Sequence, residues 1–217
     1  MGSSIDFVMT ALVLTNLLLV SSSQLKMGIK VIALEGILLA SLPLLVEIPL
    51  LTTRSVIFAL AILVLKGGII PAMLLKALKE AKEFREITPL VSHTASILIT
   101  SAAFIGALIV SYQMPWPEEP VSRLIVPVAF FSLFVGLFLI VSRSQAVSQV
   151  MGYLQLEFGL FIFGMSHPYK HSVLVETAVL LDVLIAVLVM GVAIRHMTRE
   201  FKHTDTRQLS VLRDFKR

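Results

Sequence analysis

The sequence contains no cysteine, and only 15% of its 217 residues are charged. The missing cysteine excludes disulfides, Cys-ligated zinc and iron–sulfur clusters from this chain. The scarcity of charge excludes an ordinary soluble domain, in which about a quarter of the residues are charged. A disordered chain is excluded as well, because 57% of the residues are hydrophobic and disorder requires low hydrophobicity. An integral membrane protein is the class that remains.

Long apolar segments account for most of the chain. Because a helix needs about 20 mainly apolar residues to cross a bilayer, we expect an all-α integral membrane protein with about seven transmembrane helices. The expected spans are Ile5–Val20, Met27–Glu47, Ser55–Leu78, Val91–Tyr112, Val121–Val141, Val147–Ser166 and Ser172–Ile194. The connections are too short for a separate soluble domain, so residues 1–217 form a single membrane domain.

Positive charges are divided unequally between the two sets of connections. With seven spans, fourteen of the eighteen Lys and Arg residues fall on the side of the C-terminus, and three fall on the other side. Lys66 is the eighteenth and lies within a span. The positive-inside rule then predicts a cytoplasmic C-terminus and an exterior N-terminus in the cell (cytoplasmic) membrane. The basic residues mark orientation, whereas nucleic-acid binding would need an organised basic domain.

Four ionisable residues lie well inside the predicted spans, namely Glu35, Lys66, Glu157 and Asp182. Each costs about 2.5–3.5 kcal/mol at the bilayer centre on an insertion scale. Ionisable groups at this depth commonly mark proton or ion pathways, so we favour a proton relay through these four residues. A purely structural ion pair between Lys66 and a carboxylate is the alternative. Glu176, nearer the exterior end of the last span, is a candidate for the exterior mouth of the path.

The residues that follow Lys66 are expected to disturb the regular helix. Pro71 has no N–H to donate to the carbonyl of Gly67, four residues earlier. We therefore predict a helix break or a π-bulge at Gly67, Gly68 and Pro71. A carbonyl released there can bind water or a partner group, and the alternative is a bend that fits the neighbouring helices.

The two halves of the chain share a local pattern. Residues 33–38 (ALEGIL) align with residues 155–160 (QLEFGL) at an offset of 122. Each segment follows a connection rich in Ser and Gln. The predicted organisation is a parallel repeat of two three-helix sets. The first set occupies residues 1–85, a spacer helix and exterior turn 86–120, the second set 121–197 and a cytoplasmic tail 198–217.

The second half carries a family resemblance. Ser142–Leu160 (SRSQAVSQVMGYLQLEFGL) and residues 175–190 resemble the hydrogenase-4 membrane subunit family, component E, and Lys66 in the third span fits the same family. The C-terminal three-helix set also resembles the small three-helix subunit of respiratory complex I. In that subunit, acidic residues of the second and third helices lie on the hydrophilic axis of the membrane. Glu157 and Asp182 match them, although the aspartate stands where that subunit has glutamate.

This resemblance implies a membrane subunit of a complex-I-related [NiFe]-hydrogenase complex of the formate hydrogenlyase type. The subunit would carry part of a proton or Na⁺ path and perform no bond chemistry. The [NiFe] centre and iron–sulfur clusters would lie in partner subunits. Those partners would be antiporter-like and complex-I-like membrane subunits and the hydrogenase peripheral arm, with membrane lipid around them. A small subunit of a multisubunit cation/proton antiporter and a purely structural scaffold are the alternatives.

We expect no catalytic residue and no metal site in this chain. The sequence has no evident nucleophile–base motif or phosphate-binding glycine loop. His167 and His171 are four residues apart, but Pro168 interrupts any helix that would bring them together. A retinal photoreceptor is disfavoured because the predicted last span contains no lysine.

Overall fold

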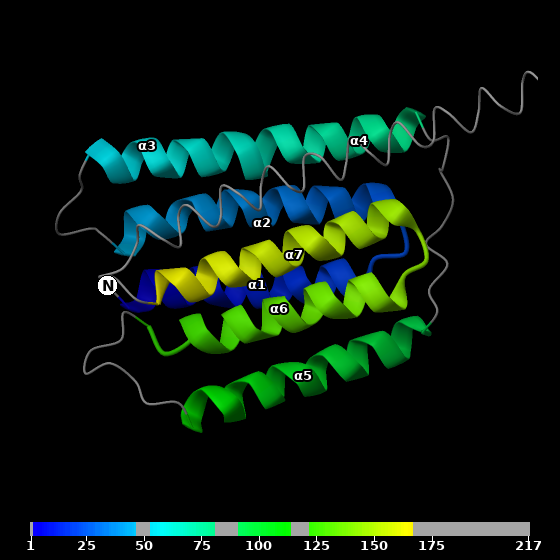
Figure 1. The fold of residues 1–217 in the computed structure, drawn as a ribbon. Helices are drawn as coiled ribbons and strands as arrows, with labels where there is room; N and C mark the ends of the chain where they lie inside the picture. Colours follow the sequence, from blue (N-terminus) through cyan, green and yellow to red (C-terminus); the bar gives the residue numbers. More distant parts are fainter. Residues whose placement is uncertain (1, 47–52, 81–90, 114–121, 167–217) are drawn as a thin grey trace, which may run out of the picture.

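The structure is a computed structural model that describes residues 2–46, 53–80, 91–113 and 122–166. Within these ranges the regular structure is helical and no strand occurs. In chain order the helices are α1 (Gly2–Ser21), α2 (Leu25–Val46), α3 (Thr53–Ile62), the π-helical segment η2 (Leu63–Ile69), α4 (Ile70–Glu80), α5 (His93–Gln113), α6 (Ile125–Ser142) and α7 (Ala146–Met165). Because α3, η2 and α4 follow one another directly, they form one continuous helix (Figure 1).

Five of the described helices are long and apolar enough to cross a membrane: Ser3–Ser21, Leu25–Val46, Ser55–Lys79, His93–Gln113 and Ile125–Ser142. The helix α7 has 20 residues, which is sufficient length, but Gln149, Gln155 and Glu157 lower its hydropathy. The described helices coincide within a few residues with the first six predicted spans. The seventh predicted span (172–194) and the tail (198–217) lie outside the described residues.

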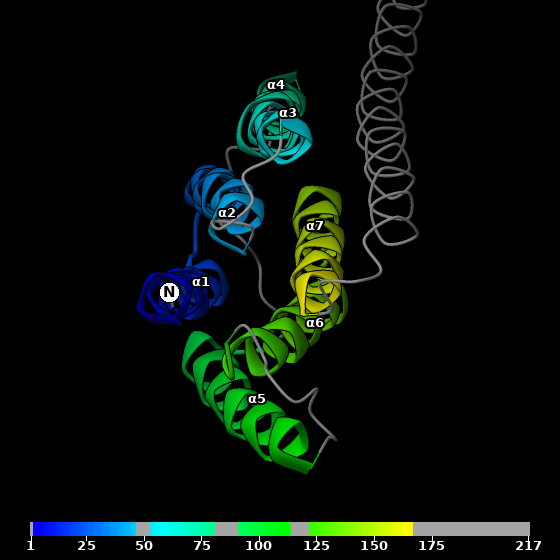
Figure 2. The same ribbon diagram turned by 90° about the vertical axis from the view of Figure 1, so that its left-hand side faces the viewer.

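The helices run side by side along a common direction (Figure 1). Seen end-on, α1, α2, α6 and α7 occupy the middle of the array, with α3 and α4 beyond α2 and with α5 beyond α6 (Figure 2). The α1–α2 and α6–α7 connections lie at the same end of the bundle (Figure 1). The helix α2 begins at that end (Figure 1), and Lys26 is its second residue. This end corresponds to the predicted cytoplasmic side, and its orientation in a membrane stays a prediction.

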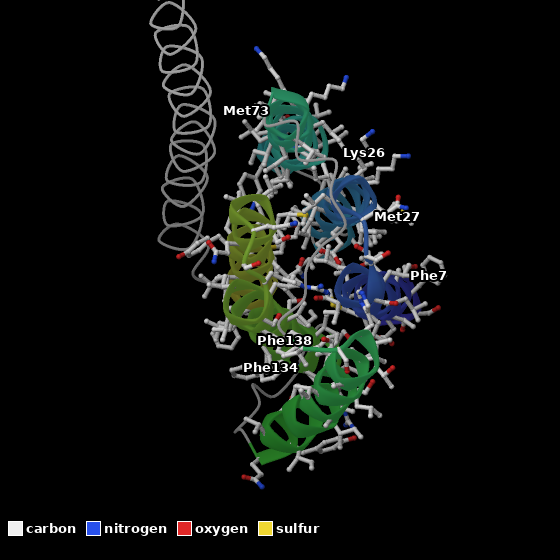
Figure 3. All side chains as sticks on the ribbon, turned by 90° about the vertical axis from the view of Figure 1, so that its right-hand side faces the viewer. Phe7, Lys26, Met27, Met73, Phe134 and Phe138 are labelled. Atoms are coloured by element: carbon white, nitrogen blue, oxygen red, sulfur yellow. The ribbon has the colours of Figure 1, made fainter. Side chains whose placement is uncertain are left out.

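Large apolar side chains cover much of the outside of the bundle. Phe7 of α1 is 74% exposed and points away from the other helices (Figure 3). Ile57 of α3, Leu98 of α5 and Leu137 of α6 are also exposed. Extensive apolar surface of this kind is unfavourable in water and is matched to a lipid environment. The protein is therefore a multi-pass membrane protein.

The helices α6 and α7 pack with their backbones close together. A Cβ atom added at Gly136 would lie 2.6 Å from the backbone nitrogen of Leu156, and one added at Gly152 would lie 2.8 Å from the carbonyl oxygen of Gly136. Small residues allow membrane helices to approach this closely. The fit fixes the rotation of α7 about its axis, and so it determines where Gln155 and Glu157 point.

Arg143, in the connection between α6 and α7, is buried rather than exposed like a typical loop charge. Its Nη2 donates a hydrogen bond of 2.8 Å to the carbonyl oxygen of Val20, in the last turn of α1. A cation is favourable at this end of a helix dipole, while burial lowers the pKa of the Arg143 guanidinium from its ordinary value. The contact fastens the second half of the chain to α1.

Candidate functional site

Two of the predicted residues, Lys66 and Glu157, form an ion pair inside the bundle. Lys66 Nζ donates a hydrogen bond to Glu157 Oε1. The lysine side chain is 2% exposed and the glutamate side chain 1%. The two residues are 91 positions apart, so it is the packing of η2 near α7 that brings them together.

Two aromatic rings of α7 flank the Lys66 ammonium. Nζ lies 5.3 Å from the ring centroid of Phe158 and 5.3 Å from that of Phe161, which is within the range of cation–π attraction. The Phe161 ring also contacts the Phe58 ring of α3, with centroids 6.2 Å apart. These apolar surroundings strengthen the attraction of Lys66 to Glu157, and they make either charge costly to bury alone.

The lysine stands in the middle of the π-helical segment η2. The Ile70 N–H donates to the carbonyl oxygen of Leu65, five residues earlier, as π-helical geometry requires. Gly67 and Gly68 lie inside η2, and Pro71 lies in the first turn of α4. The chain therefore has no interruption at these residues: the helix continues, and it is widened over Leu63–Ile69.

The helix α2 approaches η2 very closely at Gly36. A Cβ atom added there would lie 2.5 Å from the carbonyl oxygen of Lys66 and 2.9 Å from the nitrogen of Gly67. Glycine is the residue that fits such a contact, because it has no Cβ. The backbone next to Glu35 is thus in contact with the backbone that carries the lysine.

Glu35 itself is fully buried, with 0% of its surface exposed. Its polar neighbours are Thr15 of α1 and Gln155 of α7. Neither carboxylate oxygen has a hydrogen-bond partner among the described residues. The structure therefore places Glu35 in the interior but outside the Lys66–Glu157 pair.

An uncharged polar network, which the sequence reasoning missed, adjoins Glu35. Gln155 Nε2 donates to Asn16 Oδ1 over 2.8 Å. Asn16 Nδ2 donates to the carbonyl oxygen of Leu12 over 2.8 Å and to Ser132 Oγ over 3.2 Å. The network therefore joins α7, α1 and α6. A signal was present in the sequence, because Asn16 falls within the first apolar span, where an amide needs a partner.

Gln155 and Glu157 lie on the same helix but contact residues of two different helices. They are two positions apart, which corresponds to about 200° around an α-helix. Gln155 accordingly faces α1, and Glu157 reaches the lysine of η2. The Glu157 carboxyl group can take up or release a proton, whereas the Gln155 amide can only donate and accept hydrogen bonds. In the described part of the chain no three His, Cys or acidic residues are close enough together to hold a metal ion. Asp182 and Glu176 lie outside the described residues.

Comparisons with known proteins bear on the whole chain. No family model matches the sequence, and no solved structure matches it. A similar curated protein is the uncharacterized protein Rv0085 of Mycobacterium tuberculosis (strain ATCC 25618 / H37Rv), which is 33% identical over 211 residues. The matched region covers 97% of this chain and 96% of that protein. The likeness therefore extends over all the described helices rather than over a single motif.

Proposed function

The chain belongs to the family of the mycobacterial protein Rv0085, and we propose that it is a membrane subunit of a complex-I-related [NiFe]-hydrogenase complex of the formate hydrogenlyase type. It contributes buried charged groups to a proton or Na⁺ path and performs no bond chemistry. The [NiFe] centre and iron–sulfur clusters belong to peripheral-arm subunits. Antiporter-like and complex-I-like membrane subunits are its neighbours in the cytoplasmic membrane.

The observation that carries this proposal is the ion pair between Lys66 and Glu157. Burying two charges costs several kcal/mol per ion before their attraction is counted, and well-packed apolar residues of similar volume often serve stability equally well. Ionisable groups held inside a membrane at such a cost are typical of ion and proton paths. The resemblance of Ser142–Leu160, which contains the glutamate, supports the assignment to a hydrogenase complex.

The proposed path extends beyond this pair. Glu35 supplies a second buried carboxylate, and Gly36 next to it contacts the backbone of Lys66. We assign relay roles to Glu35, Lys66, Glu157 and Asp182, and we place Glu176 at the exterior mouth. The widened helix at η2 supports the assignment, since π-helical segments occur frequently at functional sites.

A static ion pair that holds η2 near α7 is a second candidate, favoured by the Phe158 and Phe161 rings around the ammonium. The double variant Lys66→Met with Glu157→Leu separates the two functions. A relay predicts that the assembled complex loses proton pumping during redox turnover, as followed with a pH-sensitive dye in membrane vesicles. A static pair predicts that pumping is unchanged, because apolar packing replaces the pair.

Asp6→Asn is the matched control for a lost carboxylate. Asp6 Oδ1 accepts a hydrogen bond of 2.5 Å from Ser122 Oγ and is half-buried near the start of α1. It lies away from both buried glutamates in sequence and has no assigned relay role. We expect Asp6→Asn to assemble and to pump normally. Unchanged pumping in the double variant, in a normally assembled complex, would contradict the relay.

Co-purification distinguishes the hydrogenase from a cation/proton antiporter. Purification of the chain from native membranes in mild detergent, followed by mass spectrometry, identifies its partners. A [NiFe] large subunit among them supports the proposal. Antiporter subunits without any hydrogenase subunit would replace it with the antiporter assignment.

A further inference from the structure

The orientation of the Asn16 side chain is determined by the Leu12 carbonyl. Asn16 Nδ2 lies 2.8 Å from that oxygen, which can only accept a hydrogen bond. The amide nitrogen must therefore face Leu12, because the exchanged orientation would bring two acceptors together. Asn16 Oδ1 is consequently the atom that faces Gln155.

The same argument then orients Gln155. Since Asn16 Oδ1 only accepts, Gln155 presents Nε2 to it over 2.8 Å. The Gln155 Oε1 atom is left at the opposite corner of the amide. It is buried and has no hydrogen-bond partner within the described ranges. A buried acceptor in this condition requires a donor.

Glu35 also has buried oxygens that lack a hydrogen-bond partner among the described residues. Both of its oxygens are buried without a hydrogen-bond partner in the part of the chain that the structure describes. Its neighbour Thr15 donates its hydroxyl to the Leu12 carbonyl over 3.0 Å, and the Lys66 ammonium is bonded to Glu157. The described residues thus give Glu35 neither a hydrogen bond nor a counter-charge, and a carboxyl group in such apolar surroundings takes up a proton rather than remaining ionised.

Burial favours a proton as the group that neutralises Glu35. Each Glu35 oxygen has less than 1 Å² of accessible surface, and a proton can be added there without opening space between the helices. The protonated carboxyl group gains one O–H donor, and the side chain of its neighbour Gln155 has an amide oxygen that lacks a donor in the described part of the chain.

We propose that Glu35 is held as the neutral acid and that its O–H donates a hydrogen bond to Gln155 Oε1. Asn16 is the residue that orients the glutamine. One O–H then satisfies a carboxyl oxygen and an amide oxygen together. Glu35 and Gln155 form a proton-holding site separate from the Lys66–Glu157 ion pair. The protonation state stands by itself, and only its use in transport rests on the proposed function.

Infrared difference spectroscopy of the full-length protein in lipid nanodiscs tests this proposal. A protonated carboxyl group has a C=O stretching band that is separate from those of ionised carboxylates and shifts in deuterated water. We expect the wild type to show this band, Glu35→Gln to lose it, and Glu157→Gln to keep it. Gln155→Leu should move the band to higher frequency, because the carboxyl group loses its acceptor, and Asn16→Leu should move it in the same direction by less.

The proposal is overturned if the protonated-carboxyl band is still present in Glu35→Gln. It is also overturned if the band keeps its frequency in Gln155→Leu. If Glu35→Gln fails to fold, Gln155→Leu still provides the test, since that chain retains every carboxyl group. The Asp6→Asn variant is the control and should leave the band in place. The spectra require no partner subunit. Failure of the protonation proposal can therefore be distinguished from failure of the proposed transport function.

Discussion

Glu35 and Glu157 align at an offset of 122 residues, yet their surroundings differ. Glu157 is bonded to the ammonium of Lys66, whereas the polar neighbours of Glu35 are uncharged. The lysine belongs to the first half of the chain and pairs with the glutamate of the second half. A local match in sequence therefore does not imply the same electrostatics, because the residue contributed by another helix determines whether a buried carboxylate has a counter-charge.

The largest expected effect is on stability when this balance is removed. Glu157→Gln removes the carboxylate that is bonded to the buried Lys66 ammonium and should lower the free energy of unfolding by about 3–5 kcal/mol. Glu35→Gln removes no counter-charge and should cost about 1 kcal/mol or less. Unfolding in dodecyl sulfate mixed micelles, followed by circular dichroism, measures both.

The double variant Lys66→Met with Glu157→Leu is the control for this prediction. It removes both charges and should recover most of the stability lost in Glu157→Gln, because neither charge of the pair remains buried. Equal losses for the two single glutamate variants would contradict the contrast between them.

A smaller effect is expected where the two sites come into contact. Gly36→Ala introduces a Cβ 2.5 Å from the Lys66 carbonyl oxygen, and backbone cannot yield as a flexible side chain can. We expect a loss of about 1–3 kcal/mol from overpacking, measured by the same unfolding assay. Gly68→Ala is the matched control, since nothing lies within 4 Å of its added Cβ, and it should cause no loss.

The smallest effect belongs to the edge of the uncharged network. Ser132→Ala removes the acceptor of the 3.2 Å hydrogen bond from Asn16 Nδ2. The expected loss is about 0.5–1.5 kcal/mol, typical of one hydrogen bond. The carboxyl band assigned to Glu35 should stay in place, because the Leu12 carbonyl still orients Asn16. A displaced band would show that the serine, too, determines that orientation.

The spans were predictable because apolar length alone marks them. The predicted Val91–Tyr112 corresponds to His93–Gln113, whereas the predicted Val121–Val141 corresponds to Ile125–Ser142. The helix α6 begins later than predicted for a physical reason. Hydropathy reports partition into lipid and does not identify the residue at which helical hydrogen bonding begins. The π-helical segment also begins at Leu63, upstream of the glycines and proline that suggested a disturbance.

The candidate site was predictable in its charged members but not in its pairing. The sequence left several carboxylates as partners for Lys66, and the tertiary packing selects Glu157. Asn16 and Gln155 were not among the predicted residues, because their amides are uncharged and the prediction was based on ionisable side chains. Their mutual orientation depends on a Leu12 carbonyl and on helices brought together by folding, which no spacing along the chain reveals.

The widened helix at Leu63–Ile69 can also be understood as an insertion. A π-helical turn is equivalent to an α-helical turn that has accepted one additional residue. In a regular α-helix, one additional residue would rotate everything after it by about 100° around the helix axis. The wider turns of Leu63–Ile69 can take up such a residue locally, so that α3 and α4 keep their faces toward the bundle while the backbone around Lys66 departs from α-helical geometry.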